Sequence, residues 1–305
     1  MIDGLNALAA VAALALAVAL AGGFELGEVA DAEAAAVSTA PIEDATGLRV
    51  PAARYERIAS ATTIGDQVLD GIVEPERLIA VTGESKRNGQ QPWRHEGRAA
   101  IEDLEDLETL IALQPDLVVV ANVAEARRVA RLREAGLQVF DIGGDSGAEA
   151  LAATTRTLGR LVGAPERAEA MAERFERRLA AIAAPGAERP GALYVGAWGS
   201  QLFGGAAGTS YHDVLVAAGL RDVAADDGLT GWPTYDAERL LVLDPEWLVV
   251  PASNGDAFCG RERFAAMQAC REGRVAAIDD HILGDPGYGM LPAAEALHRR
   301  VFGEP

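Results

Sequence analysis

Residues 107–121 read LETLIALQPDLVVVA, and residues 237–252 read AERLLVLDPEWLVVPA. Both stretches contain a glutamate, six further residues, a proline, an acidic residue and a valine-rich run. A helix that leads through a proline turn into a buried strand is a common α/β device, so one copy alone would mean little. Two copies at distant places in one chain predict two lobes of similar topology.

Short β-rich runs alternate with helical patterns around both copies, as they do in parallel α/β units. In the first lobe we expect strands at residues 57–60, 78–81, 116–121 and 138–142, and helices at residues 65–72, 102–113 and 124–135. In the second lobe we expect strands at residues 192–197, 248–251 and 275–278. The run at 116–121 is almost continuously apolar, which is typical of a strand covered on both faces.

The alternation stops between the lobes, where residues 148–183 show no strand pattern. Gly163-Ala164-Pro165 divides this stretch into two helices, and the second carries Met171, Phe175 and Leu179 at helical spacing. We therefore predict an α/β fold of two Rossmann-like lobes with parallel sheets, joined by a single long α-helix. The expected divisions are an N-terminal lobe at 54–146, a helical connector at 147–186 and a C-terminal lobe at 187–305.

The charge balance bears on the kind of partner. The 305 residues include 27 Lys and Arg against 46 Asp and Glu, which gives a net charge of −19. A nucleic-acid-binding protein needs a basic face, so we expect no nucleic acid partner. The chain also lacks the phosphate-binding, dinucleotide-binding, nucleophile-elbow and zinc-protease motifs, and these absences favour binding over catalysis.

The amino terminus suggests export. Residues 4–24 carry no charge and are rich in Ala, Leu and Val, although Asp3 stands where an export signal is usually positive. Ala30-Asp31-Ala32 fits a small-x-small cleavage pattern, so we predict an export signal or a membrane anchor at 1–32 and an acidic linker at 33–53. The protein is then expected in the periplasm; a buried cytosolic helix is the alternative.

Candidate ligand-binding residues lie in the loops that follow the predicted strands, because ligands of α/β lobes bind at the carboxyl ends of strands. Three of the four tryptophans fall in these loops, which suggests stacking on a flat or bulky ligand; the alternative is that they cover the core. The fourth, Trp247, is expected in the core. The candidates are Thr62, Thr63, Glu84, Trp93, Arg94, Asn122, Trp198, Tyr211, Trp232 and Tyr288.

Metal-ligating residues are few and scattered. The four histidines have no i,i+2 or i,i+4 spacing, which argues against a dedicated zinc or manganese site, although His95, Tyr211 and Tyr288 stay open as ligands of a bound iron or cobalt. Cys259 and Cys270 flank a helix expected at 261–269, which would hold them about 16 Å apart. A disulfide requires Cα atoms within about 7 Å, so it would form only if the chain folds back.

Six stretches together resemble one known family. They read RIAS, LDGIVEPERLIAVT, LETLIALQPDLVVVA, LREAGLQVFDIG, GWPTYDAERLLVLDPEWLVV and CREGRVAAID, and they lie between residues 57 and 302. In this order they resemble the periplasmic solute-binding proteins of ABC importers for ferric siderophores, haem and vitamin B12. The resemblance implies a monomer without an intrinsic cofactor that captures an iron or cobalt chelate and delivers it to an ABC permease with its ATPase. Gly231-Trp232-Pro233 is similar to vitamin-B12-binding members and favours a corrinoid.

The resemblance also implies docking residues. In that family a glutamate on each lobe binds arginines of the permease, and the matching positions are Glu108 and Glu238. Taken alone, both could be ordinary acids in the first turn of a helix. Where the family has Ser-Pro-x-x-Thr-Glu, this chain has Thr62-Thr63-Ile64-Gly65-Asp66-Gln67, so the resemblance does not fix the ligand.

Three other functions stay open at this point. The first is a permease-free cofactor-handling or chelatase-like enzyme on the same two-lobed fold. The second is a divalent-metal (Zn or Mn) binding protein. The third is a membrane-tethered sensory module that uses residues 4–24 as its anchor.

Overall fold

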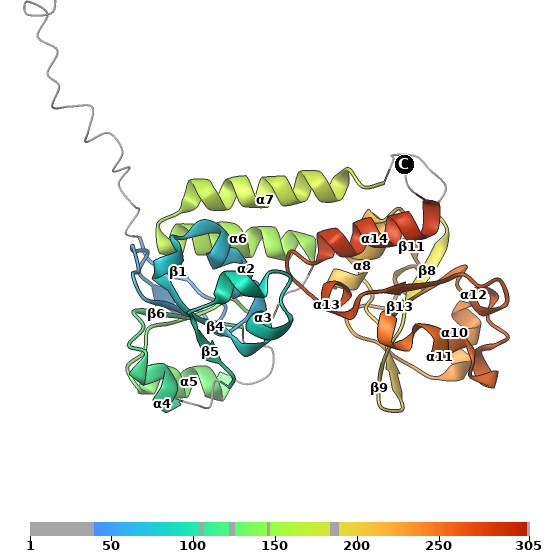
Figure 1. Ribbon diagram of the computed structural model, residues 1–305, viewed down its shortest axis with the longest axis horizontal. Helices are drawn as coiled ribbons and strands as arrows, with labels where there is room; N and C mark the ends of the chain where they lie inside the picture. Colours follow the sequence, from blue (N-terminus) through green and yellow to red (C-terminus); the bar gives the residue numbers. More distant parts are fainter. Residues whose placement is uncertain (1–39, 104–106, 122–125, 145–146, 184–188, 304–305) are drawn as a thin grey trace, which may run out of the picture. The chain divides into compact units, whose positions relative to one another are not determined.

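Five parallel strands form the sheet of the first lobe, in the order β5-β4-β3-β6-β7 in the computed structural model (Figure 1). The strands are β3 (Ile58–Ser60), β4 (Leu78–Thr82), β5 (Ala99–Ile101), β6 (Leu117–Val120) and β7 (Val139–Asp141). All four residues of β6 are fully buried, which confirms the reading of this run as a strand covered on both faces.

The structure describes residues 40–103, 107–121, 126–144, 147–183 and 189–303. The predicted export segment at 1–32, the first residues of the predicted linker and the candidate residue Asn122 lie outside these ranges. Within them, no helix combines the length and the apolar character needed to cross a membrane.

Helices cover both faces of the first sheet. They are α2 (Thr63–Ile72), α3 (Gly83–Asn88), α4 (Leu107–Ala112) and α5 (Ala126–Glu134), with the 3-10 turns η1 (Pro75–Arg77) and η2 (Pro92–His95). The helix predicted at 102–113 begins later than expected, since Glu102 and Asp103 are not helical. A short antiparallel pair, β1 (Ile42–Glu43) and β2 (Arg49–Val50), precedes the sheet.

The second lobe repeats the order of the first. Its parallel sheet runs β11-β8-β13-β14, built from β8 (Gly191–Tyr194), β11 (Arg221–Asp222), β13 (Trp247–Pro251) and β14 (Val275–Ile278). Strands β8, β13 and β14 thus take the places of β3, β6 and β7, which confirms two lobes of similar topology. The predicted strand at 192–197 is wrong in one respect, because it divides into β8 and β9 (Gly196–Trp198).

Strand β9 belongs to a separate antiparallel sheet, in which it pairs with β10 (Gln201–Phe203) and β10 pairs with β12 (Thr234–Tyr235). The helices of the second lobe are α8 (Ser210–Ala217), α9 (Val223–Asp226), α10 (Ala237–Leu243), α11 (Gly255–Cys259), α12 (Gln268–Arg271), α13 (Asp280–Leu283) and α14 (Met290–Phe302), with η3 (Ala252–Asn254) and η4 (Glu262–Phe264).

The two copies of the sequence repeat have the same backbone. Each begins with a short helix, α4 or α10, and each helix is followed by a left-handed residue directly before the proline, Gln114 with φ 47° and Asp244 with φ 29°. Proline disfavours the helical region for the residue before it, so the helix has to end there. These are the positive-φ non-glycine residues among the described positions, and their matching places show that the repeat is structural.

Two packed helices connect the lobes. Helix α6 (Ala148–Val162) ends at Gly163, which has φ 77°, and α7 (Pro165–Ala180) then runs beside α6 (Figure 1). Helix α7 contacts α2 of the first lobe and α14 of the second, so it is the long connecting helix that the sequence predicts. One hydrophobic cluster passes through Phe175 of α7 and continues to Leu297 of α14, and such a continuous core stiffens the joint.

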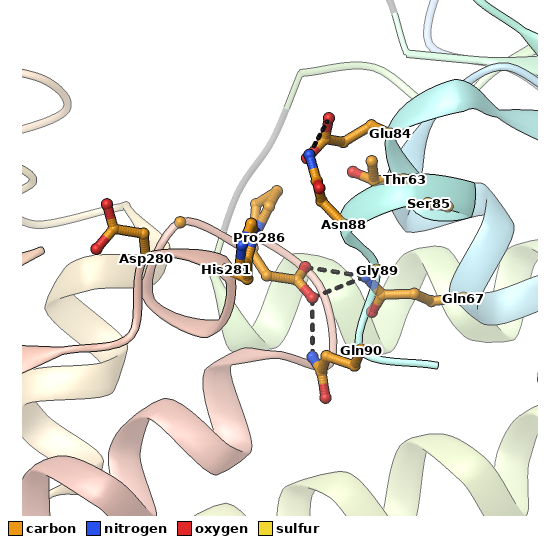
Figure 2. A pocket seen from close by; sticks show the side chains of 12 residues that line it. Thr63, Gln67, Glu84, Ser85, Asn88, Gly89, Gln90, Asp280, His281 and Pro286 are labelled. Atoms are coloured by element: carbon orange, nitrogen blue, oxygen red, sulfur yellow. Dashed lines mark hydrogen bonds between the residues drawn. The ribbon is translucent and has the colours of Figure 1, made fainter. Parts of the chain in front are cut away.

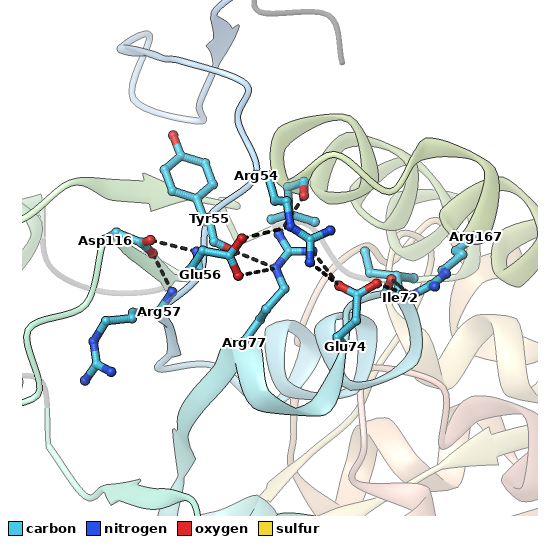
Figure 3. Close-up of polar contacts among 10 residues, drawn as sticks. Arg54, Tyr55, Glu56, Arg57, Ile72, Glu74, Arg77, Asp116 and Arg167 are labelled. Carbon is cyan, nitrogen blue, oxygen red and sulfur yellow. Dashed lines mark hydrogen bonds and ion pairs between the residues drawn. The ribbon is translucent and has the colours of Figure 1, made fainter. Parts of the chain in front are cut away.

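A buried arginine ties the connector to the first lobe (Figure 3). The Arg77 guanidinium, 3% exposed, donates to the Tyr55 carbonyl at 2.6 Å, to the Val162 carbonyl at 2.8 Å and to Glu74 at 3.0 Å. The hydrogen bond from Arg77 lowers the pKa of the Glu74 carboxyl to about 2. Because Val162 ends α6, this network fixes the junction between α6 and α7 on the first lobe.

The cysteines form a disulfide. Cys259 and Cys270 are bonded, with their Cα atoms 5.4 Å apart. The helix predicted at 261–269 is therefore wrong: only η4 and the first residues of α12 are helical there. The chain folds back because Arg261 and Met267 have extended backbone, so the short helical turns between the cysteines do not join into one helix. Phe264 and Met267 are buried in the core of the second lobe.

Candidate functional site

A cavity of about 140 Å³ lies between the two lobes, and we call it the interlobe cavity (Figure 2). The first lobe contributes side chains from α2 and α3, and the second contributes α13 and the loop that follows it. Its lining residues are Thr63, Gln67, Glu84, Ser85, Asn88, Gly89, Gln90, Asp280, His281, Gly284, Asp285 and Pro286.

Asp285 closes this cavity through hydrogen bonds to the opposite lobe. Its carboxylate accepts from the Gln67 side-chain amide at 2.8 and 3.0 Å and from the Gln90 side-chain amide at 3.0 Å, which are the dashed lines that start at Gln67 and Gln90 in Figure 2. In return, the side-chain oxygen Oε1 of Gln67 accepts from the backbone N–H of Tyr288 at 2.8 Å. We call this set the Asp285 clasp. It needs an amide at position 67, because a glutamate would set two carboxylates against each other.

A second cavity, of about 230 Å³, adjoins the first and shares Gln67, Ser85, Gly89 and Gln90 with it. It also contains Arg94, which pairs with Asp70 at 2.5 Å, so the predicted ligand-binding Arg94 already has an acidic partner. His95 is buried there, and its Nδ1 lies 2.7 Å from an Arg98 nitrogen. Burial lowers the pKa of His95, which keeps the ring neutral at pH 7 with Nδ1 occupied.

The first lobe alone forms a wider hollow of about 460 Å³ that includes Thr62, Thr63 and Glu84. Thr63 and Glu84 also line the interlobe cavity, so the two spaces meet at these residues. Thr62 is the N-cap residue of α2, yet its hydroxyl makes no capping hydrogen bond. Thr62 lines the hollow, although it is largely buried.

Asp66 lies under this site and is fully buried. One of its carboxylate oxygens accepts from the Thr82 N–H at 3.0 Å and from the Thr82 hydroxyl at 2.5 Å. The Thr82 hydroxyl in turn accepts from the backbone N–H of Ser85, which caps α3. Asp66 thus fixes the helix that carries Glu84, Ser85 and Asn88 into the cavity. Burial raises the pKa of Asp66 to about 6.

We predict a pH-dependent difference between the wild type and Asp66→Asn. The folded-state pKa of Asp66 exceeds its ordinary value of 3.8, so the folded protein binds more protons than the unfolded chain between about pH 4 and about pH 6. As the pH rises through this window, the wild type should lose up to about 3 kcal/mol of stability relative to Asp66→Asn. Urea unfolding of both proteins from about pH 4 to about pH 7 measures this. A constant difference across the window would contradict it.

Aromatic side chains gather on the second lobe. Tyr194 and Tyr211 stack at 3.7 Å between ring centroids, and Trp232 meets Tyr211 edge-on at 5.4 Å. Trp232 is 54% exposed, and Trp198 on β9 is 85% exposed. Asp280, which lines the interlobe cavity, contributes to the raised pKa of Tyr194, whose main cause is burial. None of these four aromatic residues is among the residues that line the interlobe cavity.

The tyrosines that the sequence leaves open as iron ligands are held as phenols. Burial raises the pKa of both Tyr211 and Tyr288, and the Tyr288 hydroxyl lies 2.8 Å from the Thr155 hydroxyl. Across the described part of the chain, no three His, Cys, Asp or Glu side chains gather into a metal site.

Glu108 and Glu238 occupy equivalent exposed places. Each lies in the first turn of its helix, α4 or α10. Neither carboxylate forms a hydrogen bond or an ion pair with another described residue.

The structure thus brings part of the predicted set together. Thr63 and Glu84 line the interlobe cavity, Thr62 lies beside them, and Arg94 and Tyr288 line the adjoining cavity. Trp93 lies apart, in a shallow hollow with Lys86 and Glu96. The sequence analysis missed Asn88, Gln90, Asp280 and Asp285; the run Asp285-Pro286-Gly287 was the available signal for a site loop.

Comparison with known proteins gives the family. Residues 58–300 match the family model described as periplasmic binding protein. The chain belongs to the periplasmic binding protein family. A cobalamin-binding protein of Halobacterium salinarum is 32% identical over 157 residues, which is 48% of this chain and 41% of that protein. The chain therefore matches less than half the length of this relative.

Solved structures of periplasmic binding proteins share the fold. A periplasmic heme-binding protein from Pseudomonas aeruginosa is 25% identical, with a TM-score of 0.66 over 80% of this chain and 92% of that chain. The periplasmic vitamin B12 binding protein of Vibrio cholerae is 20% identical, with a TM-score of 0.64 over 81% of this chain and 97% of that chain. Both likenesses agree with the two α/β lobes and the connecting helix.

Proposed function

We propose that this periplasmic binding protein is the solute receptor of an ABC importer, which captures a bulky metal chelate between its lobes and delivers it to the permease. The observation that carries the proposal is the cavity between two lobes of similar topology, and exposed aromatic side chains on the second lobe offer a further binding surface. Aromatic faces bind flat, largely apolar ligands, and a few polar groups orient them. On this proposal the chain acts in the periplasm, and its lobes divide at 54–146 and 187–305.

Among metal chelates, a corrinoid suits the site best. Tyr288 is hydrogen-bonded to Thr155, Tyr211 stacks on Tyr194, and Nδ1 of His95 lies against Arg98, so each of these side chains already has a protein partner. The described residues therefore favour a ligand whose metal is already held by its own macrocycle and side ligands over one that needs an anionic protein ligand. The cobalamin-binding relative from Halobacterium salinarum supports the same class.

Replacement of Trp232 tests the ligand surface. In Trp232→Ala we expect the Kd for cobalamin to rise about fivefold, since an aromatic contact contributes about 1 kcal/mol. Trp93→Ala is the matched control, because Trp93 is equally exposed but lies in a separate hollow. Equilibrium dialysis with cobalamin measures both. Equal affinities for Trp232→Ala and the wild type would show that Trp232 does not contact the ligand.

A further inference from the structure

The carboxylates that line the interlobe cavity are satisfied by neutral donors. Glu84 of the first lobe accepts from the Asn88 side-chain amide at 3.1 and 3.2 Å (Figure 2). Asp280 of the second lobe accepts from the backbone N–H of Ser253 at 3.0 Å and from the Ser253 hydroxyl at 2.5 Å. Asp285 accepts from the amides of the clasp. None of the three carboxylates forms an ion pair with a described Lys or Arg.

The acids just outside this cavity are paired with arginines instead. Asp70 lies 2.5 Å from Arg94 and 2.7 Å from Arg98, and Glu102 lies 2.7 Å from Arg87. Arg94 lines the adjoining cavity, and Arg87 lines the wider hollow of the first lobe. The arginines nearest to the cavity are therefore neutralised by acids that do not line it.

The other basic side chains around the site offer a ligand little more. The described lining of the interlobe cavity contains no Lys or Arg. Its histidine, His281, directly follows Asp280 on α13, so a proton on its ring would be offset by that carboxylate. Arg128 in the wider hollow already interacts with another residue. An anionic group that enters the cavity would thus lose its hydration, meet like charges and gain no counter-ion.

We infer that Glu84, Asp280 and Asp285 select for ligands whose rim carries neutral hydrogen-bond donors and against ligands whose rim carries carboxylates. The inference rests on the proposed function and deepens it, because it specifies a corrinoid with amidated side chains. A carboxylate can accept a hydrogen bond from the NH2 group of a carboxamide, whereas a ligand carboxylate offers it no donor. The same macrocycle with free acid side chains, and haem with its propionates, belong to the disfavoured class.

A pair of matched ligands tests this selection. Cyanocobalamin and its monocarboxylates, in which hydrolysis has converted one propionamide into a propionate, have almost the same shape and differ by one charge. Kd is measured by equilibrium dialysis for cyanocobalamin and for each monocarboxylate isomer separately. For the isomer whose propionate faces the cavity, the wild type should bind about tenfold more weakly than it binds cyanocobalamin. This ratio should shrink when the salt is raised from about 0.05 M to about 0.5 M.

Variants assign the ratio to the cavity carboxylates. In Glu84→Gln, Asp280→Asn the ratio should fall to about twofold, because two of the three repelling charges are gone. Asp285 is left unchanged, since it also holds the clasp. Glu166→Gln is the matched control and should keep the wild-type ratio, because Glu166 is an exposed acid on α7 outside these cavities. Each ratio compares two ligands on one variant, so a loss of affinity shared by both ligands cancels.

The outcomes separate the inference from the proposed function. If the wild type binds every monocarboxylate isomer as tightly as cyanocobalamin, the charge selection is overturned and the cobalamin receptor stands. If the tenfold ratio persists in Glu84→Gln, Asp280→Asn, these carboxylates are not its cause and the inference is overturned as well. A wild type that does not bind cyanocobalamin at all would contradict the proposed function together with the inference.

Discussion

Uptake of cobalamin should fall to background in the double variant Glu108→Ala, Glu238→Ala, while the purified variant binds cobalamin with unchanged Kd. Both carboxylates are exposed and lie outside the cavities described here, so removing them leaves the ligand site intact. In an interface with permease arginines, loss of one partner of a buried charge pair costs about 2–5 kcal/mol. Two such losses in one complex abolish delivery. Labelled cobalamin uptake into proteoliposomes that contain the permease and its ATPase measures this.

Glu166→Ala is the control for this variant, since Glu166 is an exposed acid in the first turn of α7. It should transport like the wild type, which excludes a general effect of surface charge. A double variant that loses cobalamin affinity would show that Glu108 and Glu238 act on the ligand. A double variant that transports normally would show that delivery does not depend on them.

Asp285→Ala should bind cobalamin about thirtyfold more tightly than the wild type. A corrinoid is too large for the interlobe cavity of about 140 Å³, because drug-sized ligands already need about 300–1,000 Å³. The Asp285 clasp must therefore open before the ligand enters, and the apparent affinity is lowered by the fraction of molecules that are closed. Hydrogen bonds from Gln67 and Gln90 to the carboxylate contribute about 2 kcal/mol together, and this is the free energy that the variant no longer has to overcome.

Asp280→Asn is the control for the clasp. Asp280 lines the same cavity but accepts from Ser253 within its own lobe, so it does not bridge the lobes. Its replacement should change the Kd little. If Asp285→Ala weakens binding instead, then Asp285 contacts the ligand and the clasp is not what limits entry.

Much of the fold could be predicted because its signals are local. The run LVVV at 117–120 is apolar without interruption, and Gly163 and Pro165 end one helix and begin the next. The repeat identifies two equivalent helix–strand units, and α4 with β6 and α10 with β13 confirm them. These features depend on residues close together in sequence.

The site was harder to predict because its contacts are distant in sequence. Gln67 and Asp285 meet only after both lobes fold on α7, and a lone glutamine or aspartate gives no pattern. Helix α3 is short and polar, so periodicity does not reveal it. The disulfide was obscured because residues 261–269 read as one helix, whereas extended backbone at Arg261 and Met267 divides this segment and brings the cysteines together.

The measurement that tests the central claim most directly is a titration of the purified protein, followed by tryptophan fluorescence, with cobalamin, haemin and a panel of ferric siderophores. Trp232 and Trp198 are exposed, so a bound chelate should quench their emission. We predict saturable quenching at one equivalent by cobalamin, and weak or no response to the other compounds. Saturation by haemin or a siderophore alone would support a metal-chelate receptor but exclude a corrinoid as its ligand. No response to any chelate would contradict the metal-chelate receptor itself.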